Sequence, residues 1–452
     1  MPLRERLGHA IAGFGQNLVY NVLTLFLLVY LYEDLKLSSR GIATLTVVLT
    51  VVRIWDAVND VVIGLLIDRT RTRWGTFRPY PVITALPIAI LTTVLFAIPA
   101  PADRSGETRA IILVAIAYLL WDMVYTASDV PFWSLTSVMT SDEGERTKIV
   151  ARARIAAMLA LATMTLGGPW LGSTIGWTWT AGLISFLGMA LFTLASLLTR
   201  ERVPHNPNPI PFREALRHIA TNYPLHRVLG SMILGFGSTI FAVGGAVIAV
   251  VVFGDVTAFT VLGGALIGGM ITGLLISPPI LQHTTRRLAL IGANLFGAVV
   301  FLALWLIGYA SMTVVAAGLF LVGVSMGVNL VCTTAMIGDS ADDTELRTGE
   351  RTDGSCFAGM TFTTKLNSAL ATMVFGFAVA YSGYEADNPV TGEMRDVIWL
   401  ACTILPAVSG VLSVLPLFGY SVDESTMADR LRAARAERAE RAERAAPVDL
   451  PD

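Results

Sequence analysis

Three charged residues and an amide lie within eight positions of a long apolar stretch. Residues 41–67 are otherwise typical of a membrane-spanning helix, yet they contain Arg53, Asp56, Asn59 and Asp60. Residues three and four positions apart share one face of a helix, so these side chains form a polar cluster. A carboxylate in hydrocarbon costs about 2.5–3.5 kcal/mol even on the most lenient scale, so the cluster must face protein or water. The pattern predicts a cation site; the alternative, a structural ion pair with Arg53, accounts for one acid but not two.

A second polar stripe crosses the apolar residues 109–137. Asp122 and Asp129 are seven positions apart and share a helix face, on which Thr126 and Trp133 also fall. A carboxylate one turn from an indole suits a polyhydroxylated ligand, because the acid accepts hydroxyl protons and the ring packs on an apolar sugar face. The alternative is an interfacial tryptophan beside an acid that lines a pore without touching a ligand.

The composition indicates a polytopic membrane protein. Of 452 residues, 54% are hydrophobic and 15% are charged, whereas soluble proteins average about 25% charged. The three cysteines form no CxxC pair, and no histidine has metal-ligand spacing. We find no Ser-His-Asp arrangement, phosphate loop or removable signal peptide. The chain is therefore expected to be a non-enzyme without a resident cofactor.

The chain contains enough apolar stretches for twelve spans of about 20 residues each. We predict an all-α membrane protein whose spans are residues 9–32, 41–67, 79–100, 109–137, 151–174, 178–199, 227–253, 257–280, 287–309, 312–337, 355–383 and 396–419. Cytoplasmic loops are enriched in Lys and Arg. If both termini are cytoplasmic, 25 of the 32 basic residues lie inside, five outside and two in the membrane. This asymmetry places both ends in the cytoplasm.

A long, proline-containing inner connection divides the chain near its middle. We predict a first six-helix bundle at residues 1–199, a cytoplasmic linker at 200–226, a second six-helix bundle at 227–420 and a cytoplasmic polar tail at 421–452. Lys365 is a single ammonium in the eleventh span, so we expect it to contact an acid from the other half. Such a contact either senses cation occupancy or is a purely structural bridge.

Four segments, in order along the chain, resemble one transporter family. They are Arg53-Ile54-Trp55-Asp56-Ala57-Val58-Asn59-Asp60, Arg73-Trp74-Gly75-Thr76-Phe77-Arg78-Pro79, Asp129-Val130-Pro131-Phe132-Trp133-Ser134-Leu135 and Gly349-Glu350-Arg351-Thr352-Asp353-Gly354, with Lys365 behind the last. Across roughly residues 10–420 the chain resembles the glycoside–pentoside–hexuronide:cation symporters, typified by melibiose permease, of the major facilitator superfamily. The resemblance implies a two-bundle fold with alternating access.

The resemblance also implies roles for individual residues. A Na⁺, Li⁺ or H⁺ site is implied at Asp56, Asn59, Asp60 and Thr126. Substrate contacts are implied from Tyr125, Asp129, Trp133, Arg154 and Lys365. With this family in view, Gly64, Asp68 and Arg69 at the end of the second span are interpreted as a gate at the inner surface.

Three positions depart from the family pattern. The family's first-helix aspartate, a sugar ligand, aligns with Asn17, and the proline usual after the cation motif is Val61. Residues 312–337 contain no counterpart of the family's tenth-helix tryptophan. Asp122 is an additional acid on the Asp129 face, and we hypothesise that it partly replaces the missing carboxylate. The cation site thus matches the family, whereas the substrate site is altered.

These observations predict a Na⁺-, Li⁺- or H⁺-coupled symporter of a sugar or glycoside. It is expected to act as a monomer in the plasma membrane, with lipid and a small molecule but no nucleic acid as partners. A transporter of a lysolipid or another amphiphile is the alternative. A proton-coupled drug exporter and a sensor that binds ligand without moving it are further options.

Overall fold

The computed structural model describes most of the chain. It covers residues 2–68, 72–140, 143–202, 217, 220–348, 353–386, 388–422, 427, 430, 433 and 434. Within these ranges the side chains of residues 57, 58, 60–62, 64–68, 104, 137, 143, 144, 146, 147, 348 and 353–355 are not described. Most of the predicted linker and tail lies outside the described residues, so the predicted domain boundaries stay predictions.

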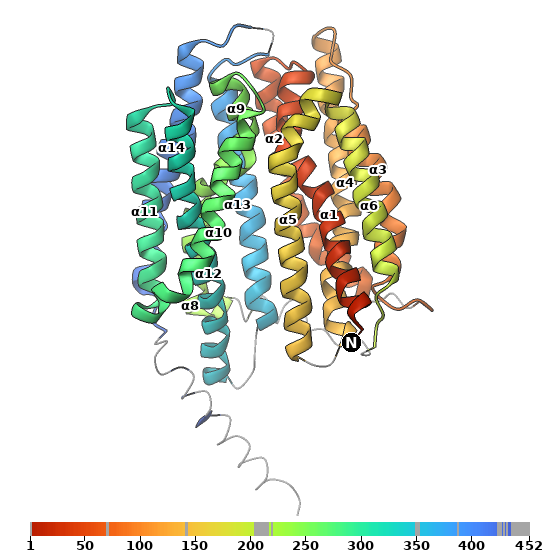
Figure 1. Cartoon of the computed structure of the whole chain (residues 1–452), viewed down its shortest axis with the longest axis vertical. Coiled ribbons are helices and arrows are strands. Elements are labelled where there is room, and N and C mark those ends of the chain that lie inside the picture. Colours follow the sequence, from red (N-terminus) through yellow and green to blue (C-terminus); the bar gives the residue numbers. More distant parts are fainter. Residues whose placement is uncertain are drawn as a thin grey trace, which may run out of the picture.

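In the part of the chain that the structure describes, the helices form twelve rods, and Figure 1 shows how they run side by side. The first six are α1 (Leu3–Val29) with the π-helix η1 (Tyr30–Asp34), α2 (Ser39–Asp68), α3 (Pro79–Leu95), α4 (Arg104–Met139), α5 (Glu143–Ile175) and α6 (Trp177–Leu197). The other six are α8 (Tyr223–Leu234) with the 3₁₀-helix η2 (Phe236–Thr239) and α9 (Ile240–Phe253), α10 (Ala258–His283), α11 (Arg286–Ile307), α12 (Met312–Thr348), α13 (Asp353–Tyr381), and α14 (Gly392–Leu412) with the 3₁₀-helix η3 (Leu415–Gly419). Over the described ranges, nine helices are long and apolar enough to cross a membrane, and no strand is present. The predicted all-α membrane fold is confirmed.

Short polar residues set where several helices begin. The Asp103 carboxylate accepts the N–H of Gly106 at 2.6 Å and caps α4. The Asn222 side chain caps α8 in the same way, accepting the N–H of Leu225 at 3.0 Å. Each cap satisfies an N–H that has no partner within its helix. Gly176, with φ at +81°, separates α5 from α6 in one residue because glycine tolerates this backbone conformation.

The seventh rod is interrupted, whereas the sequence suggests one continuous span over 227–253. The interruption at η2 packs against α14, where a Cβ on Gly237 would lie 2.7 Å from Cα of Pro406. The Ser409 hydroxyl accepts the N–H of Gly237 at 2.9 Å and donates to the carbonyl of Leu234 at 2.6 Å. The hydroxyl therefore satisfies backbone groups that the interruption frees, as a broken helix in a membrane requires.

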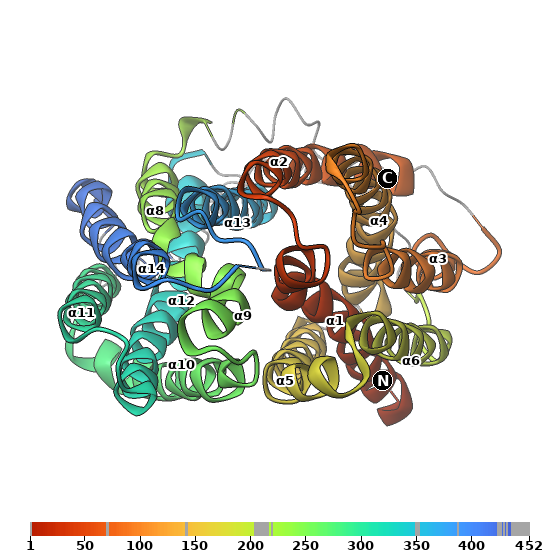
Figure 2. The ribbon, with the colours of Figure 1, turned by 90° about the horizontal axis from the view of Figure 1, so that it is seen from above.

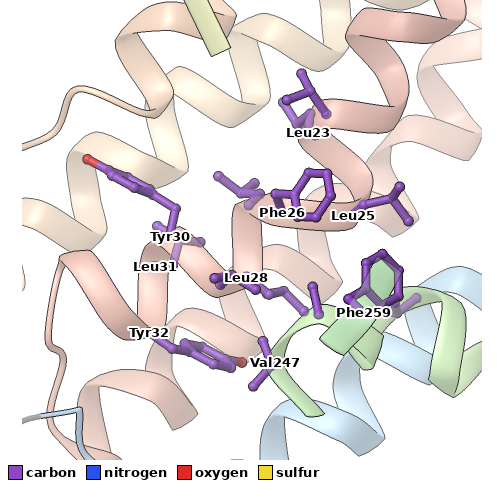
Figure 3. Packing of buried hydrophobic residues seen from close by; sticks show 14 of the residues in the cluster. Leu23, Leu25, Phe26, Leu28, Tyr30, Leu31, Tyr32, Val247 and Phe259 are labelled. Atoms are coloured by element: carbon purple, nitrogen blue, oxygen red, sulfur yellow. The ribbon is translucent and has the colours of Figure 1, made fainter. Parts of the chain in front are cut away.

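The rods form two bundles. Figure 2 shows α1–α6 on one side of the molecule and α8–α14 on the other. A large apolar core runs along α1 and continues into α9 and α10. Figure 3 shows this core where Phe26 of α1 approaches Phe259 of α10, with ring centroids 6.0 Å apart and edge to face. The two bundles are thus packed together near the end of α1.

Polar contacts join the bundles at the same end. The Tyr384 hydroxyl donates to the Glu33 carboxylate, and the Ser39 N–H donates to Glu385 at 3.1 Å. Burial, together with the nearby Glu33 carboxylate, raises the pKa of the Tyr384 phenol well above its ordinary value. The phenol therefore stays protonated and keeps donating at physiological pH. A closer approach lies between α2 and α13, where a Cβ on Gly376 would collide with the Thr46 side chain.

Candidate functional site

Asp56 lies where α2, α4 and α13 meet. Its Oδ1 accepts a hydrogen bond from the Lys365 ammonium at 2.9 Å and another from the Thr126 hydroxyl at 3.2 Å. The lysine and aspartate side chains are 25% and 21% exposed. The predicted contact between Lys365 and an acid of the other half is confirmed, and this acid is Asp56. The Asp56 carboxylate therefore links the polar residues of α2 and α4, in the first bundle, to α13 in the second bundle.

The rest of the predicted cation cluster is described only in part. Asn59 is 2% exposed, and its side-chain Nδ2 has no hydrogen-bond partner among the described residues. Arg53 donates to the Ser368 hydroxyl of α13, so the cation of this segment also reaches the other bundle. The side chain of Asp60 lies outside the described part. No group of three or more His, Cys, Asp and Glu suited to a metal occurs where side chains are described.

Asp129 of α4 is held by two donors. Its Oδ1 accepts from the Trp133 indole N–H at 3.1 Å and from the Gln16 side-chain amide at 3.1 Å. The guanidinium carbon of Arg154, from α5, lies 4.2 Å from the centroid of the Trp133 ring. This stacking is a cation–π contact. The predicted carboxylate–indole pair therefore exists, and α1, α4 and α5 all contribute to it.

Gln16 is the residue that sequence reasoning missed. It is completely buried, and its Oε1 has no hydrogen-bond partner among the described residues. Asn17, the predicted substrate residue next to it, is half-buried and donates to the carbonyl of Gly13 in its own helix at 2.8 Å. The sequence does show two polar amides, Gln16 and Asn17, in an apolar span. Their position along the helix alone does not show which of the two reaches Asp129.

Aromatic rings extend this site along α4. Tyr125 stacks on Trp121, with centroids 4.7 Å apart, and lies 5.5 Å from the ring of Tyr20 on α1. Asp122 is also buried, one turn from Thr126. Tyr20, Trp121 and Tyr125 thus form an aromatic cluster between α1 and α4, on the helix that also carries Thr126 and Asp129. Flat apolar rings next to hydrogen-bonding groups suit a polyhydroxylated ligand.

The predicted gate is not described. Gly64 and Asp68 lie in the last turns of α2, where side chains are outside the described set, and Arg69 falls outside the described residues altogether. Their roles stay predictions. α2 begins at Ser39, which contacts Glu385 beside the Glu33–Tyr384 pair, and it runs away from that contact toward Asp68.

Comparisons with known proteins cover nearly the whole chain. Residues 8–424 match the family described as MFS/sugar transport protein. The inner membrane symporter YicJ of Escherichia coli is 25% identical over 427 residues, which cover 92% of this chain and 91% of that protein. The isoprimeverose transporter of Lactiplantibacillus pentosus is 24% identical and covers 94% of this chain and 90% of its own length.

A solved structure supports the same fold. It is a bacterial homologue of the human lysosomal transporter Spinster, in an inward-facing and unoccupied conformation. It shares 14% sequence identity with this chain at a TM-score of 0.66, covering 96% of this chain and 98% of the homologue. The chain therefore belongs to the MFS/sugar transport family, among the relatives of the glycoside–pentoside–hexuronide symporters of the major facilitator superfamily, and is a membrane transporter rather than an enzyme.

Proposed function

We propose that the protein is a cation-coupled symporter that carries a sugar or glycoside across the plasma membrane by alternating access. The observation that carries this proposal is the meeting of Thr126 and Lys365 on one oxygen of Asp56. An ion bound at that carboxylate lies next to Thr126, on the helix α4 that carries the predicted substrate residues, and next to Lys365, which joins the two bundles. Relatives named as a symporter and as an isoprimeverose transporter are consistent with this function.

The coupling cation binds at Asp56, Asn59, Asp60 and Thr126. Hard cations prefer such oxygen ligands, so Na⁺ and Li⁺ fit. A proton fits as well, because two neighbouring carboxylates readily share one. In the absence of the ion, the Lys365 ammonium neutralises Asp56 across the bundle interface. The incoming cation replaces this ammonium and releases it, so ion occupancy is transmitted to the second bundle.

The substrate binds beside the ion. The group that forms its site is Asn17, Asp122, Tyr125, Asp129, Trp133, Arg154 and, once released, Lys365, with Gln16 added by the geometry. Sugar hydroxyls donate to Asp129, and one apolar face of the ring packs on Trp133. Because Asp129 is already oriented by Gln16 and Trp133, little ordering of the carboxylate is needed when a ligand binds.

Coupling follows from the charge of the ion site. A site without the ion keeps a negative charge that is paired only with Lys365 of the second bundle, so it resists movement of the bundles past each other, whereas an ion-filled site does not. With both termini in the cytoplasm, the Glu33–Tyr384 contact lies on the outward side, where it holds the two bundles together. The residues Gly64, Asp68 and Arg69 then lie at the inner gate. An ion gradient drives uptake because the ion and the substrate bind the outward-facing and inward-facing conformations with different affinities.

The test is transport by the purified protein in proteoliposomes. The Asp60→Asn variant should lose cation-driven accumulation of labelled glycosides, whereas Asp255→Asn, a change in an exposed loop between α9 and α10, should accumulate them normally. Accumulation by Asp60→Asn at the wild-type level against a gradient would refute the coupling site. If wild-type protein binds glycosides yet fails in counterflow, it is a sensor rather than a transporter.

A second candidate is transport of a lysolipid or another amphiphile. It is favoured by Asn17, an amide where the family carries an aspartate that binds sugar, since a neutral residue suits a less polar ligand. A ligand-protection screen separates the two substrate classes. Thermal stabilisation by glycosides favours the first candidate, and stabilisation by lysolipids alone favours the second.

A further inference from the structure

A small pocket lies away from the proposed transport path, between the start of α3 and the end of α6. It has a volume of about 160 Å³ and is lined by Arg73, Trp74, Arg78, Ser196 and Leu197. Figure 2 shows α3 and α6 at the outer edge of the first bundle, away from the second bundle. The pocket, formed by the start of α3 and the end of α6, therefore lies at the outer edge of the first bundle.

The loop before α3 is folded around a carboxylate. Both oxygens of Glu201 accept backbone N–H groups, from Thr76 and Phe77 at 2.9 Å and from Arg78 at 3.0 Å. Gly75 has a φ of +113°, and a Cβ there would collide with Glu201. This geometry directs the glutamate charge to backbone donors, so it does not pair with the arginine side chains of the pocket.

The pocket retains hydrogen-bonding groups that the protein does not satisfy. Ser196 is 3% exposed, and its hydroxyl has no hydrogen-bond partner among the described residues. The buried Nε of Arg78 likewise has none among them, whereas Nη1 and Nη2 of the same guanidinium donate to the carbonyls of Trp74 at 3.5 Å and Leu197 at 3.2 Å. No ion pair with a described residue involves Arg73, which is exposed. The Ser196 hydroxyl and the Arg78 Nε are fully buried, so the donors open to a ligand are those at the ends of the two guanidinium groups, which match a phosphate.

The surroundings of the pocket are apolar. Ile83 and Leu86 on α3, and Leu194 on α6, are exposed and lie within about two helical turns of the pocket. Such side chains on a membrane protein contact acyl chains. Trp74 is also exposed, and tryptophan is enriched at the level of lipid headgroups. A ligand with a phosphate at one end and hydrocarbon at the other matches both surfaces together.

We propose that this pocket binds the headgroup of an anionic membrane phospholipid. The phosphate contacts Arg73 and Arg78, and the acyl chains follow the apolar surface of α3 and α6. With both termini cytoplasmic, the lipid belongs to the inner leaflet. The bound lipid fastens the connection between α2 and α3 to the end of α6.

The test is lipid binding to the full-length protein in detergent, measured by native mass spectrometry. The probes are phosphatidylglycerol and phosphatidylcholine with identical acyl chains, and inorganic phosphate is added separately. Wild-type protein should bind phosphatidylglycerol in preference to phosphatidylcholine. A basic residue near an anionic lipid contributes roughly 1 kcal/mol, so Arg73→Gln should weaken phosphatidylglycerol binding about fivefold. Because no hydrogen bond joins Arg73 to another described residue, this variant should fold normally.

A matched control is available in the other bundle. Arg287 is a half-buried arginine at the same end of the molecule, and unlike Arg73 it donates to a carbonyl near a helix end, that of Phe418 at 3.1 Å. Arg287→Gln should leave phosphatidylglycerol binding unchanged. The proposal is overturned if Arg73→Gln binds the lipid like wild type, or if Arg287→Gln weakens binding equally. It is also overturned if phosphatidylcholine binds as tightly as phosphatidylglycerol. Displacement of the lipid by millimolar inorganic phosphate would overturn it too, because that result would indicate a site for a soluble anion.

Discussion

Replacing Lys365 by methionine tests whether its ammonium competes with the coupling cation. The substitution Lys365→Met keeps a similar volume but removes the charge that lies 2.9 Å from Oδ1 of Asp56. A cation that binds this oxygen in the wild type must first displace the ammonium. In the variant it binds without that competition. We therefore expect tighter cation binding in Lys365→Met, in contrast to the loss expected from removing a ligand.

The size of the effect follows from the environment of the pair. A hydrogen bond between charged groups contributes about 1.5–3 kcal/mol net. Because both side chains keep about a quarter to a fifth of their surface exposed, the lower end applies, and about 1.5 kcal/mol corresponds to roughly tenfold in affinity. The proposed site should thus bind Na⁺ or Li⁺ about ten times more tightly in the variant, measured without substrate by calorimetry or ion-dependent thermal stabilisation.

Ser368→Ala is the matched control. It removes the hydrogen bond from Arg53 across the same interface but leaves the charges at Asp56 unchanged. This variant should bind the cation like wild type. The reasoning is refuted if Lys365→Met binds the ion no more tightly than wild type, or if Ser368→Ala tightens binding equally. In proteoliposomes, Lys365→Met should bind the ion well yet accumulate substrate poorly, because ion occupancy no longer changes a contact between the bundles.

Three further outcomes test the packing and the substrate site. Gly376→Ala should hinder closure at the Glu33 end and shift the protein toward the opposite facing, which cysteine accessibility measures; Gly292→Ala, with no atom near its added Cβ, should not. Gln16→Ala should weaken substrate binding about tenfold, since Asp129 loses a charge-assisted hydrogen bond; unchanged affinity in a binding titration argues against it. Glu201→Ala should lower the midpoint of thermal unfolding by several degrees, because three backbone N–H groups lose their acceptor.

The helical architecture could be read from the sequence because the bilayer enforces it. Lipid offers no hydrogen bonds to the backbone, so a long apolar stretch must be helical. The twelve stretches correspond to the twelve rods, and the short separation at Gly176 is real. The interruption of the seventh span was not predicted. It depends on Ser409, a residue over 170 positions away, whose hydroxyl satisfies the freed backbone at Gly237.

The candidate site, like the fold, could be predicted from the sequence only in part. Local spacing was sufficient to pair Asp129 with Trp133, one helical turn apart. The cost of a buried charge was sufficient to predict that Lys365 contacts an acid, although charge alone did not identify Asp56. Gln16 could not be distinguished from Asn17, because two adjacent amides differ by about 100° around a helix and the facing of α1 depends on tertiary packing.

The arrangement at Asp56 also explains why the two bundles are unequal. The described acids of the site, Asp56, Asp122 and Asp129, all lie in the first bundle, and the second contributes a cation, Lys365, to this meeting point. An ammonium fixed to the second bundle neutralises the ion site only while the bundles are close, whereas a mobile ion can neutralise it in either facing. The bundles can then separate around Asp56 without leaving an uncompensated carboxylate only when the mobile ion is bound. In the proposed mechanism, ion coupling therefore requires one fixed cation and one exchangeable cation to share the same oxygen.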